Sequence, residues 1–251
     1  MSVIFILDDE YFQITDWKRE LIRCLDTIDP EEIFHVGACS DTLNQDIQFL
    51  MIRNYESTKL IADWCNANSR RMIYSSSAAN YGDSGANPSN LYGWSKYTAE
   101  DYVLNRGGLA LRYFNVYGPG EANKGRMASF LYQAFLKSKS NEEIRLFPGK
   151  PQRDFIYIED VISANIFASN NFEKLLGQYY EVSTGVAHSF EDVLEIFGFK
   201  YKYMSESSIP SGYQFFTCGK PEKWMPGWSP NYALASGILD YKLKLEADFV
   251  K

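Results

Sequence analysis

The 251-residue sequence lacks the basic clusters of nucleic-acid-binding proteins and the long apolar runs of membrane-spanning proteins. Lys and Arg number 25 against 32 Asp and Glu, which gives a net charge of −7. Nucleic-acid affinity rests mostly on clustered Lys and Arg, so we expect no nucleic-acid partner. No apolar run approaches the roughly 20 residues that a membrane-spanning helix needs, and the quickly acidic start is unlike a signal peptide. We therefore expect no membrane partner either.

Metal-ligand and disulfide patterns are also missing. The sequence has two histidines and four scattered cysteines, with no Cys-x-x-Cys pair, at Cys24, Cys39, Cys65 and Cys218. Metal sites are built from such residues at short, regular spacings, so no metal is predicted. Single scattered cysteines are typical of free thiols in a reducing compartment. The expected location is the cytoplasm.

Glycine is absent from the first 36 residues. Many dinucleotide-binding proteins open with a strand, a glycine-rich turn and a helix whose backbone amides hold the pyrophosphate. Later glycines do not rebuild this turn. Gly82 and Gly85 are followed by Pro88 where a third glycine would stand, and Gly118 and Gly120 belong to a later loop. The sequence therefore predicts an incomplete dinucleotide site.

Apolar runs rich in β-formers alternate with helical patterns along the first half of the chain. A long helix is predicted after Asp41, and another from Leu91 to the Gly107-Gly108 break. Three buried strands alternate with these helices, and they are predicted at 33–36, 71–76 and 109–116. Such alternation favours an α/β fold with a doubly wound parallel sheet of Rossmann-like type.

From about Gly118 onward, loop-rich stretches alternate with short helical segments near 159–169 and 189–198. We interpret residues 1–117 as a truncated Rossmann-like domain. Residues 118–251 are interpreted mainly as a smaller substrate-binding lobe, with some segments returning to the sheet. Open α/β sheets bind ligands at the carboxyl ends of their strands, so the site is expected there.

Three residues suggest the chemistry of that site. Tyr92 and Lys96 stand four residues apart, on one face of the predicted helix. A lysine ammonium near a phenol favours the phenolate, which makes Tyr92 a candidate acid/base. Ser77 follows a strand, where its hydroxyl can bind a substrate hydroxyl and share a proton with Tyr92. Taken alone, Tyr-x-x-x-Lys also fits a solvated helix face.

Four segments in this order, SSSAANYG, YGWSK, LRYFNVYGPG and RDFIYIEDV, resemble the extended short-chain dehydrogenase/reductase family of nucleotide-sugar epimerases and dehydratases. The resemblance covers nearly everything from Ile33 onward. Within the family, HVGACSDT, NKGRMASF and GYQFFT resemble the ADP-heptose epimerases. The resemblance implies an NAD- or NADP-dependent isomerase that oxidises a carbon of a nucleotide-diphosphate sugar and reduces it again.

The resemblance also assigns roles to individual residues. It implies that Ser77 and Tyr92 form the catalytic pair, and that Lys96 holds the nicotinamide ribose and tunes Tyr92. Lys124 would act as a second acid/base, although a plain surface lysine is the simpler interpretation without the family. Ala38 would pack near the cofactor.

On the substrate side, the resemblance implies five further residues. Arg153 would grip the diphosphate, which suits a bidentate guanidinium. Asn115 would meet the substrate and Phe147 would line the base pocket. Tyr213 and Gln214 would face the sugar. Ordinary packing would also explain Phe147, Tyr213 and Gln214.

The family pattern breaks at the start of the sequence. The segment MSVIFILDDEYFQITDWKRELI resembles the family's third strand and following helix, so roughly 45 residues, two βα units, are expected to be missing. Whether the chain is an active enzyme is therefore left open. The alternative is a nucleotide-sugar-binding protein without redox activity. A homo-oligomer or a partner chain could also cover the truncated sheet.

Overall fold

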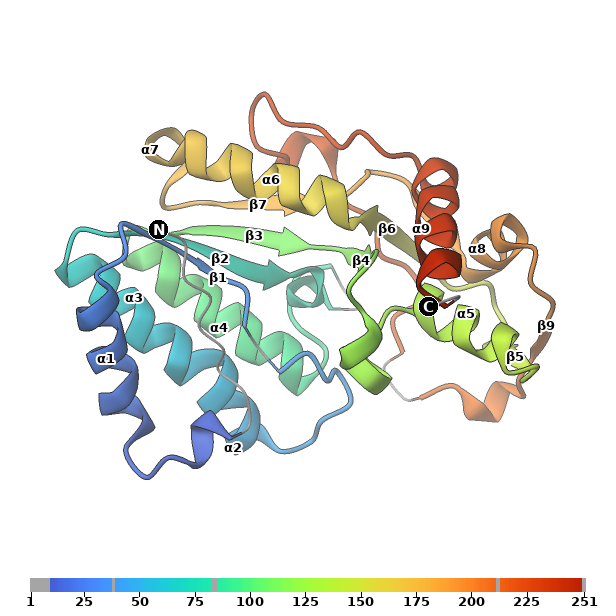
Figure 1. The fold of residues 1–251 in the computed structure, drawn as a ribbon, viewed down its shortest axis with the longest axis horizontal. Coiled ribbons are helices and arrows are strands. Elements are labelled where there is room, and N and C mark those ends of the chain that lie inside the picture. Colours follow the sequence, from blue (N-terminus) through green and yellow to red (C-terminus); the bar gives the residue numbers. More distant parts are fainter. Residues whose placement is uncertain (1–9, 38, 83–84, 211–212, 250–251) are drawn as a thin grey trace.

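A parallel sheet with helices on both faces forms one side of the molecule, and a smaller lobe stands at the carboxyl ends of its strands (Figure 1). This computed structural model describes residues 10–37, 39–82, 85–210 and 213–249. The strand expected within the first residues of the chain lies outside the described residues, and the helix expected after it is α1 (Trp17–Ile28).

The main sheet confirms the predicted doubly wound architecture. Its four parallel strands run in the order β1 (Glu32–His35), β2 (Arg71–Ser77), β3 (Leu109–Tyr113) and β7 (Tyr179–Val182). Successive residues of a strand face opposite sides. Met72 and Tyr74 accordingly pack under α1, α3 (Ser57–Ala67) and α4 (Leu91–Asn105), whereas Ile73 packs under α6 (Ile158–Asn170) and α7 (Phe172–Leu175).

The long helix predicted after Asp41 contains a widened turn. It consists of α2 (Ile47–Leu50), a π-helical segment (Met51–Glu56) and α3. Asn54, in the π-helical segment, is fully buried. Its side chain accepts from the backbone N of Cys39 at 2.8 Å and donates to Cys39 O and to Ser95 Oγ. One side chain thus holds the loop after β1 against α4.

Helix α4 begins and ends where the sequence predicted. Asn90 caps its first turn by accepting from Gly93 N at 2.7 Å. The chain leaves the helix through Gly107, whose φ of +79° suits glycine. This helix carries Tyr92 and Lys96 on its first two turns.

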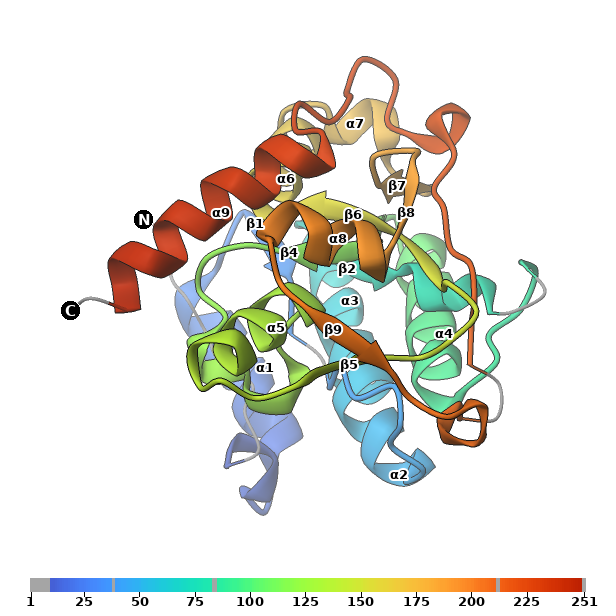
Figure 2. The same cartoon turned by 90° about the vertical axis from the view of Figure 1, so that its right-hand side faces the viewer.

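The single strand predicted at 109–116 is wrong in its second half. At Phe114 the chain leaves the main sheet, and β4 (Asn115–Tyr117) instead pairs with β6 (Gln152–Tyr157), which also pairs with β8 (Ala187–Ser189). A third pair joins β5 (Ile144–Leu146) to β9 (Tyr201–Tyr203). Helices α5 (Phe130–Lys139), α8 (Phe190–Phe197) and α9 (Leu234–Phe249) complete the lobe (Figure 2).

The predicted helices near 159–169 and 189–198 are present as α6 and α8. The lobe is built around an aromatic core that includes Tyr117, Phe135 and Tyr157. Within the described ranges, none of the helices combines the length and the apolar character needed to cross a membrane.

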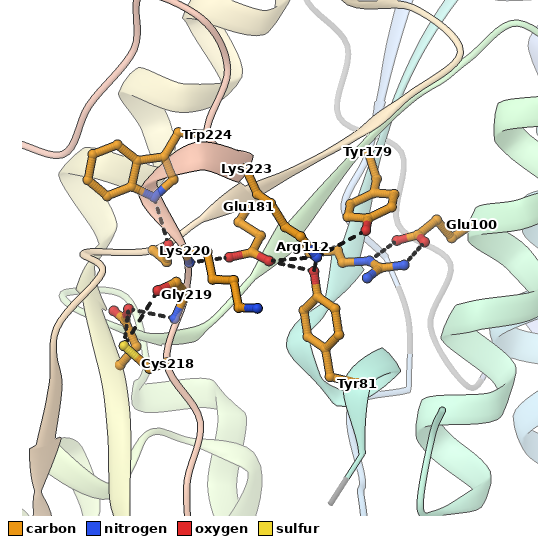
Figure 3. Close-up of polar contacts among 12 residues, drawn as sticks. Tyr81, Glu100, Arg112, Tyr179, Glu181, Cys218, Gly219, Lys220, Lys223 and Trp224 are labelled. Carbon is orange, nitrogen blue, oxygen red and sulfur yellow. Dashed lines mark hydrogen bonds and ion pairs between the residues drawn. The ribbon is translucent and has the colours of Figure 1, made fainter. Parts of the chain in front are cut away.

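A buried polar network joins the lobe to the main sheet (Figure 3). The carboxylate of Glu100 on α4 accepts from Arg112 Nε at 2.8 Å and Nη2 at 2.5 Å. The guanidinium lies 3.6 Å from the ring centroid of Tyr179 and 4.6 Å from that of Tyr81. Tyr81 in turn donates to Glu181 at 2.5 Å. Two aromatic rings therefore pack close to the Arg112 guanidinium.

The same network holds a loop of the lobe. The backbone N of Lys220 donates to Glu181 Oε2 at 2.6 Å, and the backbone N of Gly219 donates to Asp154 Oδ2 at 3.1 Å. Asp154 and Glu181 are buried in β6 and β7. Because β7 belongs to the main sheet and β6 to the lobe, this loop is fixed to both.

We predict that Arg112→Met destabilises the fold by about 3–5 kcal/mol, because it removes the ion-pair partner of the buried Glu100 carboxylate. Urea unfolding measures the change. Arg145→Met, which removes an arginine from the exposed pair with Glu143, is the matched control and should stay close to wild type. Equal unfolding midpoints for the two variants would contradict the prediction.

Candidate active site

A cavity of about 880 Å³ lies at the carboxyl ends of β2 and β3, between the main sheet and the lobe. The loop after β1, the turn after β2, the start of α4, β4 and segment 121–131 all contribute to its wall. Seven of the residues singled out from the sequence line it: Ser77, Tyr92, Lys124, Asn115, Arg153, Tyr213 and Gln214.

Ser77 and Tyr92 meet on one wall of this cavity. Ser77 ends β2 and its Oγ accepts from the backbone N of Ala79 at 3.1 Å, which fixes the turn that follows. Burial raises the pKa of Tyr92, and the hydrogen bond with Ser77 opposes this only in part. The sequence predicted a phenol tuned downward by Lys96. In the structure, desolvation raises the pKa of Tyr92 by more than the Ser77 hydrogen bond lowers it.

Lys96 lies beneath this wall and does not line the cavity. Its side chain is 2% exposed, and its Nζ donates to Ser75 O at 2.6 Å and lies 4.2 Å from the ring centroid of Tyr74. Burial lowers the pKa of Lys96 to about 7, although the Glu100 carboxylate, one turn along the helix, opposes this shift. The charge of this amine is therefore finely balanced near neutral pH.

The loop after β1 supplies a wall that sequence reasoning missed. Ser40, Thr42 and Gln45 line the cavity from this loop. Their position just after a strand of a parallel sheet is the signal that could have found them. Ala38, which the family resemblance assigned to the cofactor, lies outside the described residues.

Lys124 reaches the cavity from the lobe, on the exposed segment Ala122–Met127. The preceding residue in the wall is Glu121, which is 4% exposed and which sequence reasoning also missed. The Glu121 carboxylate accepts from Ser129 Oγ at 2.7 Å and from Tyr241 OH at 2.8 Å. Its acceptors are thus used to anchor the segment that carries Lys124.

Arg153 provides a cationic group on the lobe side. It is 9% exposed, and its guanidinium lies 5.3 Å and 5.7 Å from the ring centroids of Tyr213 and Phe190. It donates to the carbonyl oxygen of Gln214. Gln214 Nε2 donates to Gly82 O at 2.7 Å, which ties this part of the wall to the turn after β2.

The last two predicted substrate-side residues, Asn115 and Phe147, differ in their position relative to the cavity. Asn115, the first residue of β4, is exposed and lines the cavity. Phe147 does not line it, and instead packs edge-on against Tyr213 with ring centroids 5.0 Å apart. Phe147 therefore contacts the site through Tyr213.

Two curated relatives of this chain, from different bacteria, carry the same name. The chain is 40% identical over 182 residues to ADP-L-glycero-D-manno-heptose-6-epimerase of Cupriavidus pinatubonensis, covering 64% of this chain and 54% of that protein. It is 40% identical over 195 residues to the protein of the same name from Brachyspira hyodysenteriae, covering 70% and 60%. The chain thus spans little more than half the length of these curated relatives.

Solved structures agree with this comparison. The Helicobacter pylori ADP-L-glycero-D-manno-heptose-6-epimerase superposes with a TM-score of 0.80 at 30% identity, over 96% of this chain and 79% of that one. The Thermotoga maritima UDP-glucose 4-epimerase, solved with UDP-glucose, gives a TM-score of 0.79 at 22% identity, over 91% and 82%. The second likeness shows the fold alone.

A family model covers most of the chain. The model described as the NAD dependent epimerase/dehydratase family matches residues 8–183. That range contains the main sheet, the turn after β2, α4 and β6, and therefore the frame that holds Ser77, Tyr92 and Lys96. The chain belongs to the NAD-dependent epimerase/dehydratase family.

Proposed function

We propose that this chain is a nucleotide-sugar epimerase that acts on an ADP-heptose, with Tyr92 and Lys124 as its acid/base groups. The observation that carries the proposal is that one cavity is lined by Ser77 and Tyr92 from the main sheet side and by Lys124 and Arg153 from the lobe. The names of the 40% identical relatives support the choice of substrate.

The residues present fit the nicotinamide-ribose end of a dinucleotide. An ammonium group has three donors, and Ser75 O accepts one donor of Lys96. Lys96 lies one helical turn from Tyr92 but behind the cavity wall, so its remaining donors would reach ribose hydroxyls beside the tyrosine only once the wall there moves aside. Residues 1–251 contain no glycine-rich turn that would hold a pyrophosphate, so these residues fit only the nicotinamide-ribose end of the dinucleotide. When bound, the cofactor would accept a hydride from the sugar carbon and return it to the opposite face.

The chain's own groups would move protons and hold the substrate. Tyr92 would remove the proton of the reacting hydroxyl while Ser77 Oγ orients that hydroxyl. Lys124, which approaches from a different segment, would serve the epimeric hydroxyl. Epimerisation needs acid/base groups for two orientations of one carbon, and in this proposal Tyr92 and Lys124 would provide them from two different segments. Arg153 would bind the diphosphate through its guanidinium, with Asn115, Tyr213 and Gln214 on the sugar side.

The proposed location is the cytoplasm. All four cysteines are free thiols, which accords with a reducing compartment.

We predict that purified chain converts ADP-glycero-manno-heptose to its epimer with NAD or NADP, and that Tyr92→Phe lowers kcat at least about a hundredfold. The phenylalanine keeps the ring and removes the phenolic oxygen that would take up and return the proton. Tyr97→Phe, on the same helix but outside the cavity wall, is the matched control and should retain turnover. Product is quantified by chromatography, and binding of each dinucleotide by calorimetry. Binding of the nucleotide sugar without dinucleotide binding or product would support the non-redox alternative instead.

We also predict that Lys96→Met changes how stability depends on pH. The folded-state pKa of Lys96, about 7, lies below its unfolded value near 10.4, so the unfolded state binds more protons between these values. Wild-type stability should therefore rise with pH in that window. The stability gained by Lys96→Met should be largest at pH 7 or below and shrink by about 1.4 kcal/mol per pH unit above it.

Urea unfolding at pH 7 and pH 9 measures this difference. Lys174→Met, at an exposed lysine of α7, is the control and should parallel wild type at both values. A Lys96→Met difference that is the same at the two pH values would show that the buried amine is not the titrating group.

A further inference from the structure

The segment Glu121–Ser129, which carries Lys124, is fixed at both of its ends. At its start, the buried Glu121 carboxylate binds Ser129 and the Tyr241 hydroxyl of α9. At its end, Gln133 Nε2 donates to Ala128 O at 2.7 Å and to Arg126 O at 3.2 Å. The side chains between these anchors are largely exposed. The position of Lys124 therefore depends on what holds the tip of the segment.

An ion pair connects this tip to the main-sheet side of the cavity. Arg126 Nη2 lies 2.5 Å from Asp41 Oδ2, in the loop after β1. The arginine side chain is 79% exposed, whereas that of Asp41 is 12% exposed. Asp41 Oδ1 also accepts from the backbone N of Leu43 at 3.1 Å, which fixes the carboxylate in its loop. A carboxylate that is fixed in its loop thus pairs with an arginine side chain that is mostly exposed.

The Asp41 loop is itself fixed to the helix that carries Tyr92. Asn54 binds both backbone groups of Cys39 and the hydroxyl of Ser95 on α4. Ser95 lies three residues after Tyr92, whose carbonyl oxygen its hydroxyl also contacts at 2.7 Å. A continuous set of contacts therefore leads from the Tyr92 helix to Asp41 and then to Arg126.

Gly125 provides the backbone conformation that this arrangement needs. Its φ of +51° and ψ of −127° interrupt the helical turn between Lys124 and Arg126. A Cβ at Gly125 would meet no atom within 4 Å, so the backbone conformation, and not space, is what favours glycine there. The break lets two neighbouring side chains diverge, one lining the cavity and the other reaching Asp41.

We propose that Asp41 and Arg126 are positioning residues whose ion pair holds the Lys124 segment at the rim of the cavity, in register with Tyr92. This rests on the proposed function, in which Lys124 acts on the bound sugar. An exposed ion pair adds little to global stability. A displacement of about 1 Å in a reacting group can nevertheless cost about a hundredfold in rate. The effect is therefore expected in kcat and not in folding.

Turnover tests the proposal with two charge-removing variants. Asp41→Asn keeps the size of the side chain, and Arg126→Ala removes its partner. Each is expected to lower kcat by at least about tenfold, with the KM for the nucleotide sugar changed less than about twofold. Arg126→Lys keeps the positive charge and should recover part of the loss. The matched control is Glu143→Gln, which weakens surface pairs with Arg145 and Lys202 and should leave turnover unchanged. Wild-type kcat in Asp41→Asn and Arg126→Ala would overturn the proposal.

Limited trypsin digestion of the full chain tests the same pair without any turnover. Asp41→Asn retains the cleavage site after Lys124, and release of the tip should speed cleavage there about fivefold. Mass spectrometry follows the peptide that ends at Lys124, again with Glu143→Gln as control. A wild type with no turnover would refute the proposed function, while this digestion would still decide the ion pair. Equal cleavage rates in Asp41→Asn and wild type would overturn the positioning role.

Discussion

The Glu100 carboxylate is the point on which the arrangement of the site depends. It receives hydrogen bonds from Ser76 Oγ at the end of β2, from Asn80 in the following turn and from Arg112 on β3. Glu100 lies on α4, so one group joins that helix to two adjacent strands. Ser77 follows Ser76 directly, and Tyr92 and Lys96 lie on the helix. The relative positions of serine, tyrosine and lysine therefore follow from how one buried carboxylate is satisfied.

The same carboxylate governs the electrostatics under the cavity. A cation as buried as Lys96 is costly, and here it is offset by one carbonyl oxygen, one aromatic face and the charge of Glu100. Arg112 shares that charge, which limits what remains for Lys96. The balance leaves the lysine pKa near neutrality. His35, buried nearby, has its pKa lowered to about 3 by burial and by Lys96, so it remains a neutral packing group.

Much of this frame could be predicted from the sequence, because it rests on local patterns. Alternating runs predicted the strands through Tyr74 and Leu111, and Gly107 marked the end of the helix. The departure of β4 at Phe114 could not be predicted, since 109–116 has the composition of one strand throughout and the change of sheet is decided by pairing with β6. The Tyr81–Glu181 contact joins residues 100 positions apart, which no local pattern encodes.

The lobe shows why the two acid/base candidates differ in how firmly they are held. Tyr92 is half-buried on helix α4, which Asn54 and Glu100 tie to the rest of the fold, whereas Lys124 stands on a tip beyond the buried anchors at Glu121 and Ser129. Glu181 and Asp154 fix the loop at 219–220, so this part of the lobe is rigidly joined to the sheet. The Lys124 segment is held by buried contacts at its ends and by the Asp41–Arg126 ion pair at its tip. In the proposed function, a lysine held in this way would approach the sugar from the lobe, while Tyr92 approaches it from the side of the main sheet.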